Sequence, residues 1–267
     1  MTPASTSHLN LGSGTHPGET GKNNEDSFAV QFFRAANGEP ATLAVVCDGV
    51  GGNRAGEVAS ALAVKAIVES VAACQDDQYL AAFTNGVNSA TQQLTKESEV
   101  NDDLKGMGTT CAIALIVGRR LYTGYVGDSR LFLLRPSGLR QISVDHTWLQ
   151  AAIEYGLLTP EEALTHPNQH VLLRHLGTRG ESKADIRLKL ADDETPDQSE
   201  QNQGLTLDVG DTVLVCSDGL SDLVKAPDLE QVLTAAEPQA AVDRLILMAR
   251  QRGGHDNITV VVMRVIA

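Results

Sequence analysis

Two short segments of this chain repeat one pattern, in which an apolar run stops abruptly at Asp-Gly. The first reads Val-Val-Cys-Asp-Gly from residue 45, and the second reads Val-Cys-Ser-Asp-Gly from residue 215. Each run predicts a buried strand, and the glycine after the Asp permits a sharp turn or a close approach to a ligand. Asp48 and Asp218 are therefore expected where two strands leave the core.

A third carboxylate, Asp256, lies just before the apolar run 258–266. A turn-forming or helix-capping Asp is common after a strand, but three such positions in one chain favour a shared site. Carboxylates about 4 Å apart repel by roughly 4 kcal/mol per pair at an effective dielectric near 20. A cation bound among the carboxylates removes this repulsion, so the repulsion contributes to the affinity for the cation. Oxygen ligands favour Mg²⁺ or Mn²⁺ over zinc. The neighbouring His255 points the other way on an extended segment and is not expected to be a ligand.

Composition limits the classes of protein to which this chain can belong. The chain has 267 residues, 42% of them hydrophobic, and no composition break, which predicts a single domain over residues 1–267. A net charge of −13 argues against a nucleic-acid partner. The apolar runs are too short for a membrane helix, and the first residues do not resemble a signal peptide. The four cysteines lack metal or redox spacing, which predicts buried free thiols in a cytoplasmic protein.

The order of apolar patterns predicts layered antiparallel sheets covered by helices. Residues 1–16 are rich in Ser, Thr and Gly, and residues 1–11 are expected to be only partly ordered. The expected strands are 27–33, 42–47, 111–117, 121–126, 131–134, 212–217 and 258–266, and the expected helices are 54–74, 78–97, 228–234 and 239–250. Residues 146–183 form an irregular, partly helical excursion, and the acidic segment 191–204 is expected to be a solvated loop.

Several short motifs together carry a resemblance to a known family. They are Lys22-Asn23-Asn24-Glu25-Asp26-Ser27, Cys47-Asp48-Gly49-Val50-Gly51-Gly52, Gly108-Thr109-Thr110, Gly127-Asp128-Ser129-Arg130, Asp145-His146-Thr147, Cys216-Ser217-Asp218-Gly219-Leu220 and Gly254-His255-Asp256-Asn257-Ile258-Thr259. Because the motifs occur in this order, the chain resembles a bacterial-type member of the PPM family, the metal-dependent protein phosphatases of the phosphatase 2C type. Each motif alone is weak, whereas the ordered set extends from about residue 12 to the end.

The resemblance implies an α+β fold, a four-layer αββα sandwich with two antiparallel sheets flanked by pairs of helices. It also implies a mobile flap, which here covers residues 146–183. The implied activity is hydrolysis of phosphoserine and phosphothreonine by direct attack of a metal-activated water at a binuclear Mn²⁺ or Mg²⁺ centre, with two to three ions per chain. The implied partners are phosphorylated proteins and a Ser/Thr kinase, for a monomer that binds neither nucleic acid nor membrane.

The resemblance also implies roles for individual residues. Asp48 would bridge two ions, one of which the Gly49 carbonyl and Glu25 would also bind. Asp218 and Asp256 would hold the other ion, so that Asp48, Asp218 and Asp256 act in catalysis through metal-bound water. Asp128 would contribute to a third metal site, and Asp26 would belong to the same acidic cluster. A hairpin-turn role is the alternative for Asp128.

Two features depart from the family pattern. The family usually has an Arg that contacts the substrate phosphate where this chain has Gly21, and Lys22 or Arg54 is expected to replace it in part. Lysine supplies a point charge without the bidentate fork of arginine. Val50 stands where eukaryotic relatives often have a His, so no general acid is identified.

The flap contains further candidates. Arg174 and Arg179 are expected to meet an acidic phosphopeptide. The spacing of the histidines fits no zinc motif, and exposed or helix-capping roles are expected for His146, His166, His170 and His175.

Two other functions are compatible with parts of the sequence. A pseudophosphatase that only binds phosphoproteins is favoured by Gly21 and opposed by the complete acidic set. A metal-dependent nuclease is disfavoured by the negative charge and by the lack of a basic groove.

Overall fold

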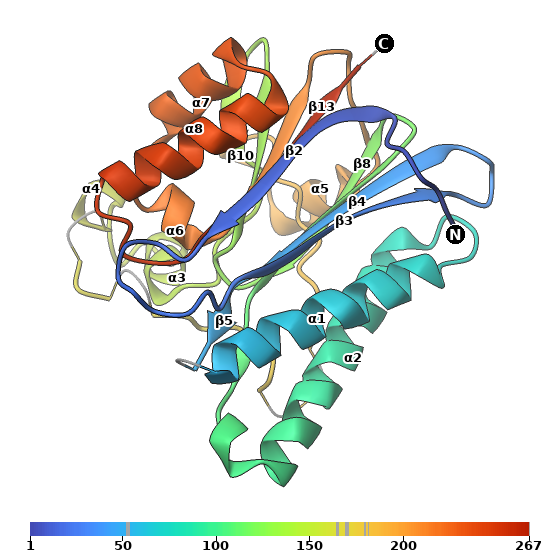
Figure 1. Cartoon of the computed structure of the whole chain (residues 1–267). Helices are drawn as coiled ribbons and strands as arrows, with labels where there is room; N and C mark the ends of the chain where they lie inside the picture. The colour runs from blue at the N-terminus through green and yellow to red at the C-terminus, as the bar shows by residue number, and fades with distance from the viewer. Residues whose placement is uncertain (52–53, 164–165, 169–170, 179, 181, 267) are drawn as a thin grey trace.

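Two antiparallel sheets pack face to face, and helices cover both outer faces (Figure 1). This computed structural model describes residues 1–51, 54–163, 166–168, 171–178, 180 and 182–266, without the side chains of residues 54, 160 and 161. The predicted α+β class and four-layer αββα sandwich are confirmed.

The first sheet has six strands and lies under the helices α1 (Arg54–Ala72) and α2 (Tyr79–Val100). Its spatial order is β1 (Thr2–Pro3), β3 (Ser27–Arg34), β4 (Pro40–Cys47), β7 (Cys111–Val117), β8 (Arg120–Val126) and β11 (Leu205–Thr206). The Asn37-Gly38 segment joins β3 to β4 with Arg34 opposite Pro40, as the hairpin signal predicts. A small separate pair, β5 (Gly49–Val50) and β6 (Gly108–Thr109), continues beyond β4.

The second sheet has five strands and is covered by α7 (Ala226–Ala235) and α8 (Pro238–Gln251). Its spatial order is β10 (Gly138–Gln141), β9 (Arg130–Arg135), β12 (Thr212–Cys216), β13 (Ile258–Val265) and β2 (Leu9–His16). The short elements outside the layers are η1 (Asp102–Leu104), α3 (Trp148–Glu154), α4 (Pro160–Ala163), α5 (Pro196–Gln201) and α6 (Asp218–Ser221).

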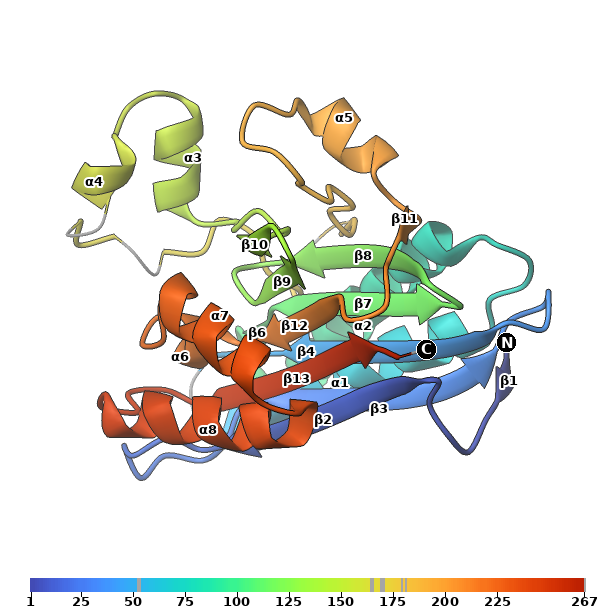
Figure 2. The same ribbon diagram turned by 90° about the horizontal axis from the view of Figure 1, so that it is seen from above.

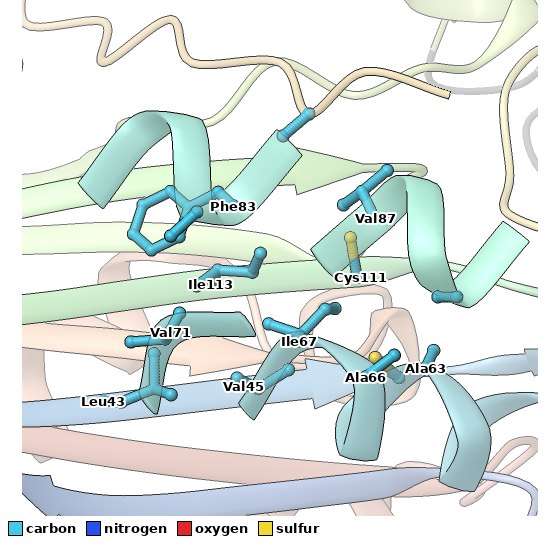
Figure 3. Packing of buried hydrophobic residues seen from close by; sticks show 14 of the residues in the cluster. Leu43, Val45, Ala63, Ala66, Ile67, Val71, Phe83, Val87, Cys111 and Ile113 are labelled. Carbon is cyan, nitrogen blue, oxygen red and sulfur yellow. The ribbon is translucent and has the colours of Figure 1, made fainter. Parts of the chain in front are cut away.

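The central strands are apolar throughout because both of their faces are buried. In β4, Leu43 and Val45 face the helices α1 and α2, while Ala44 and Val46 face the other sheet. Figure 3 shows Leu43 near Val71 and Val45 near Ile67, both of which belong to α1. Successive side chains of a strand point to opposite faces, so a strand between two cores needs an unbroken apolar run. Such a run ends where the strand passes beyond both cores.

The amino-terminal segment, expected to be only partly ordered over residues 1–11, contributes a strand to each sheet. Strand β2 pairs with β13 along its whole length, and β1 pairs with β3. A Cβ at Gly12 would lie 2.4 Å from the carbonyl of Pro238, at the start of α8. The small residues that resembled a flexible tail are therefore required under a close-packed helix.

The excursion from the sheets is longer than the predicted flap. Between β10 and β11 the described residues carry α3, α4 and α5, and Figure 2 shows α3 and α4 projecting away from the sheets. The solvated loop expected at 191–204 contains α5, whose start is fixed by a capping box between Thr195 and Gln198. None of the helices in the described ranges combines the length and apolar character that a membrane crossing requires.

Candidate metal centre

The two Asp-Gly segments lie at the same end of the sandwich. Asp48 directly follows β4 of one sheet, and Asp218 begins α6 just after β12 of the other. Figure 1 shows β5 and α6, the elements that these residues lead into, close together at this end. Asp48 and Asp218 line the same cavity, so the structure brings the two predicted ligands together.

The glycines after these carboxylates are needed because other backbone segments pass very close to them. A Cβ at Gly219 would lie 2.0 Å from the carbonyl oxygen of Asn257. A Cβ at Gly49 would lie 2.3 Å from the carbonyl oxygen of Gly56. The close approach expected at these glycines is therefore made by other backbone segments of the same protein. This packing fixes the Asp-Gly turns against the segments that carry the remaining acids.

Asn257 connects two of those segments. Its neighbour Asp256 precedes β13, which pairs with β12. The Asn257 Oδ1 atom accepts a hydrogen bond of 2.7 Å from the Glu25 N–H, and its Nδ2 donates to the carbonyls of Asn23 and Pro17 at 3.1 Å. One amide side chain thus holds the loop that carries Lys22 and Glu25 against the strand that carries Asp256.

Asp26 lies behind the acids that face solvent. Its Oδ2 accepts hydrogen bonds from Ser217 Oγ at 2.8 Å and from Thr259 Oγ1 at 2.6 Å. Its Oδ1 is buried and has no hydrogen-bond partner. Burial, and then the charges of Asp218 and Asp256, raise the pKa of Asp26 to about 7 against the two hydroxyl bonds.

Asp128 occupies the tight turn between β8 and β9 and is also buried. Next to it, Ser129 Oγ contacts Thr110 Oγ1 at 2.7 Å, and the Thr110 hydroxyl accepts a bond of 3.0 Å from the Asp48 N–H. The hydroxyl of Thr109 donates to the Asp48 carbonyl at 2.7 Å. These hydroxyls therefore join the loops of Asp48 and Asp128, a function that the sequence analysis did not assign to the Gly-Thr-Thr motif.

These segments surround a cavity of about 460 Å³. Five acidic residues line it, namely Glu25, Asp48, Asp128, Asp218 and Asp256. Of the described residues in its wall, Lys22 is the one with a basic side chain, and Gly49 and Leu172 also contribute. The structure thus brings the predicted acids to one place, with Asp26 behind the wall.

Burial and mutual repulsion hold the protons on several of these acids. Burial, followed by Asp218 and Asp145, raises the pKa of Asp128 to about 8, although Arg130 opposes this shift. Burial, followed by Asp222 and Asp256, raises the pKa of Asp218 to about 6. Burial, followed by Asp26, Asp218 and Asp256, raises the pKa of Asp48. A cation among them would supply the compensating charge.

The donor set fits hard divalent cations. It consists of oxygens, and the Oδ1 atoms of Asp26 and Asp218 are buried without a hydrogen-bond partner. The acids face one another across the cavity: in the described ranges, no three Asp, Glu, His or Cys side chains form a compact group that could enclose one ion. Ligands of this kind suit ions that sit between pairs of carboxylates and retain water.

The flap residues are placed differently from the expectations. The side chains of Arg54 and Arg179, and all of His170, lie outside the described part of the chain. The guanidinium of Arg174 is held within the flap, where Nη2 donates to the Lys183 carbonyl at 2.7 Å. Contact of Arg174 with a phosphopeptide stays a prediction.

The described flap histidines form separate contacts. His166 stacks on Trp148, and His175 Nδ1 lies 2.9 Å from the Leu176 carbonyl. His146 is buried beside Asp185, so the exposed or helix-capping role expected for it is wrong.

Comparison with known proteins agrees with the geometry. Residues 13–251 match the family described as protein phosphatase 2C. The serine/threonine phosphatase stp of Listeria monocytogenes is 31% identical over 254 residues, covering 93% of each protein. The serine/threonine protein phosphatase PstP of Mycobacterium tuberculosis is 36% identical over 230 residues, which cover 85% of this chain and 41% of PstP.

A solved structure shares the whole fold. The catalytic domain of PstP in complex with two manganese ions has a TM-score of 0.79 and 32% sequence identity, covering 97% of this chain and 99% of that one. The fold, the acids around one cavity and the match over residues 13–251 all agree. The chain belongs to the protein phosphatase 2C family.

Proposed function

We propose that this protein hydrolyses phosphoserine and phosphothreonine in other proteins, with water as the nucleophile and with divalent cations, Mn²⁺ or Mg²⁺, as cofactors. The observation that carries this proposal is the cavity of about 460 Å³ into which five acidic residues from separate segments project. Similarity to serine/threonine phosphatases and to a catalytic domain with two manganese ions supports it. The proposal includes two to three ions per chain.

In this proposal the acids divide between the ions. Asp48, the Gly49 carbonyl and Glu25 would hold one ion, and Asp48, Asp218 and Asp256 would hold another. The turn residue Asp128, supported by Asp26, would hold a third. When bound, the cations lower the pKa of a water molecule and offset the negative charge of the phosphoryl oxygens.

The chain's own side chains favour water over a protein nucleophile. Burial raises the pKa of the Cys216 thiol to about 12 and also raises that of Cys47, so neither thiol beside the cavity supplies a thiolate at neutral pH. The backbone of Asp48 is fixed by Thr109 and Thr110, which keeps its carboxylate pointing into the cavity. These residues therefore serve to orient oxygens around the reacting phosphate.

A phosphothreonine peptide tests the proposed function. With Mn²⁺ the protein is expected to release inorganic phosphate, to stop when EDTA is added and to recover when Mn²⁺ is restored. A phosphotyrosine peptide of the same sequence is the matched control and is expected to be a poor substrate. Binding of the phosphothreonine peptide without phosphate release, in either Mn²⁺ or Mg²⁺, would instead support the pseudophosphatase alternative.

Lys22 is proposed to attract the substrate phosphate in place of the family's arginine. The side chain is exposed at the cavity rim, where one charge contributes about 1 kcal/mol, so Lys22→Ala is expected to lower kcat/KM for an aryl phosphate about fivefold, mainly through KM. Lys22→Arg is the control, and its guanidinium fork is expected to preserve or raise kcat/KM. Unchanged turnover in Lys22→Ala would assign phosphate binding to another residue.

The cellular setting belongs to the same proposal. Phosphorylated proteins are the proposed substrates, with a Ser/Thr kinase as the opposing enzyme. A monomeric state, a single catalytic domain over residues 1–267 and a cytoplasmic location stay predictions. All four cysteines are free and buried, which supports a reducing compartment.

A further inference from the structure

His146 holds the backbone that leads into Asp128. Its N–H donates to the Gly127 carbonyl at 2.9 Å, and its ring Nδ1 accepts from the Gly127 N–H at 3.0 Å. Gly127 has a φ of +103°, and a Cβ there would lie 2.6 Å from Thr110 Cγ2. Both polar groups of this constrained glycine therefore bond to one residue, directly before the carboxylate that faces the cavity.

The opposite edge of the same ring faces the far end of the excursion. His146 Nε2 lies 3.0 Å from Asp185 Oδ2. Because Nδ1 accepts a hydrogen bond, the neutral ring carries its proton on Nε2, where Asp185 can accept it; Arg174 Nη1 also lies 3.1 Å from this nitrogen. Asp185 is fixed in turn by Arg187, 2.7 Å away, and by backbone pairing with Tyr125, whose ring stacks on His146. The orientation of the imidazole is therefore determined on both edges.

The backbone of His146 also anchors the flap segment that forms part of the cavity wall. Its carbonyl accepts a hydrogen bond of 2.8 Å from the Leu173 N–H, and the adjacent Thr147 pairs with Leu172. Leu172 lines the cavity that Asp128 lines from the other side. Arg174, two residues further along, lies 3.8 Å from the same Asp185 carboxylate. One buried residue thus connects Asp128 with residues 172–174.

We propose that His146 is a positioning residue that sets Asp128 and the flap segment 172–174 in fixed relation across the cavity. This inference rests on the proposed function of the cavity as a metal centre. The two ring nitrogens have separable tasks: Nδ1 holds the Asp128 turn, and Nε2 holds the flap side through Asp185. Hydrogen-bond partners outside the ligand set have this effect at other metal sites, where their loss weakens metal affinity or activity about 10- to 100-fold.

Two substitutions separate the tasks. His146→Asn retains an acceptor at the place of Nδ1 and loses the contact with Asp185. His146→Gln retains a donor at the place of Nε2 and loses the acceptor for Gly127. His166→Asn is the matched control, because His166 stacks on Trp148 within the same excursion. Each protein is examined by Mn²⁺ titration calorimetry, by hydrogen exchange of residues 127–130 and 171–174 without metal, and by kinetics on a phosphothreonine peptide.

We expect His146→Gln to weaken one Mn²⁺ binding event about 10- to 100-fold and to accelerate exchange at residues 127–130. His146→Asn is expected to keep Mn²⁺ affinity, to accelerate exchange at residues 171–174 and to raise KM for the peptide. His166→Asn should match the wild type. Wild-type Mn²⁺ affinity and wild-type exchange in both His146 variants, or the same losses in His166→Asn, would overturn the proposal.

A further variant covers the case in which a His146 variant does not fold. Asp185→Asn keeps the size of the side chain and removes the charge that orients the ring, so it is expected to accelerate exchange at residues 171–174 while Mn²⁺ affinity persists. Wild-type exchange there would contradict the proposal. A wild-type protein that releases no phosphate would refute the proposed function, whereas Mn²⁺ binding and exchange would still decide the role of His146.

Discussion

Asp218→Asn is expected to abolish phosphate release while raising the stability of the metal-free protein. Asp218 lines the cavity with Asp48, its Oδ1 atom is buried, and the neighbouring charges of Asp222 and Asp256 repel it. An amide of the same shape removes this repulsion, so the melting temperature in EDTA should rise. The loss of a cation ligand should remove about 3 kcal/mol or more of transition-state stabilisation, a decrease of about 100-fold or more in kcat/KM.

Another buried aspartate provides the control for this experiment. Asp211 is buried and paired with Arg135 at 2.9 Å, at the opposite end of β12 from Asp218. Asp211→Asn is expected to lower the melting temperature, because it weakens a satisfied ion pair, and to leave kcat/KM and Mn²⁺ affinity unchanged. Thermal unfolding in EDTA and in Mn²⁺, with peptide kinetics, checks both variants. Full turnover in Asp218→Asn would contradict its place in the metal centre.

The metal-free protein is expected to become less stable as pH rises from 6.5 to 8. The folded pKa values of Asp26 and Asp128 are about 7 and about 8, whereas an unfolded Asp titrates near its ordinary value of 3.8. Over this interval the folded state binds more protons than the unfolded state, so the free energy of unfolding falls with increasing pH. Histidine has an ordinary pKa of 6.5, and the pKa values of His8 and His146 are lowered. Below pH 6.5 these two histidines make the free energy of unfolding rise with pH, so the interval starts at pH 6.5.

Divalent cations are expected to reverse this trend. They bind the ionised carboxylates, so their stabilising effect should grow as the acids lose their protons. At 100 times the dissociation constant one ion contributes about 2.7 kcal/mol. Melting temperatures at pH 6.5, 7, 7.5 and 8, in EDTA and in Mg²⁺, measure the difference directly. A melting temperature in EDTA that rises over this interval, or a Mg²⁺ effect that shrinks with pH, would show that these acids are ionised without metal.

The sequence predicted the inner strands and helices well because their physical requirements are local. Strands β4, β12 and β13 are mainly apolar and lie between two cores. Asp48 and Asp218 come just after β4 and β12, and Asp256 comes just before β13. Two elements escaped the same reasoning. Strand β2 carries small residues because α8 packs directly on it, and α5 is a short acidic helix whose capping box is its main signal.

The site was predictable as a set of acids and less so as a network. The carboxylates follow from strand ends and motif order, and the structure places five of them around one cavity. Thr110, Asn257 and His146 act on backbone groups of residues far away in sequence, so their partners depend on the fold. All three lie within motifs quoted from the sequence. The signal that could have indicated their positioning role was a hydroxyl, amide or imidazole side chain close to a candidate ligand.

The pairing of β2 with β13 joins the first long strand to the last one, with Ile258 opposite His16. During synthesis the second sheet therefore cannot close until residues 258–265 have emerged from the ribosome. Contacts of such large sequence separation form slowly, because a long loop must close before they are made. The loop of Glu25 can contact Asn257 only at this stage. The protein should therefore acquire ion binding only after β13 has paired, and a nascent chain that stalls before Asp256 would lack a complete metal centre.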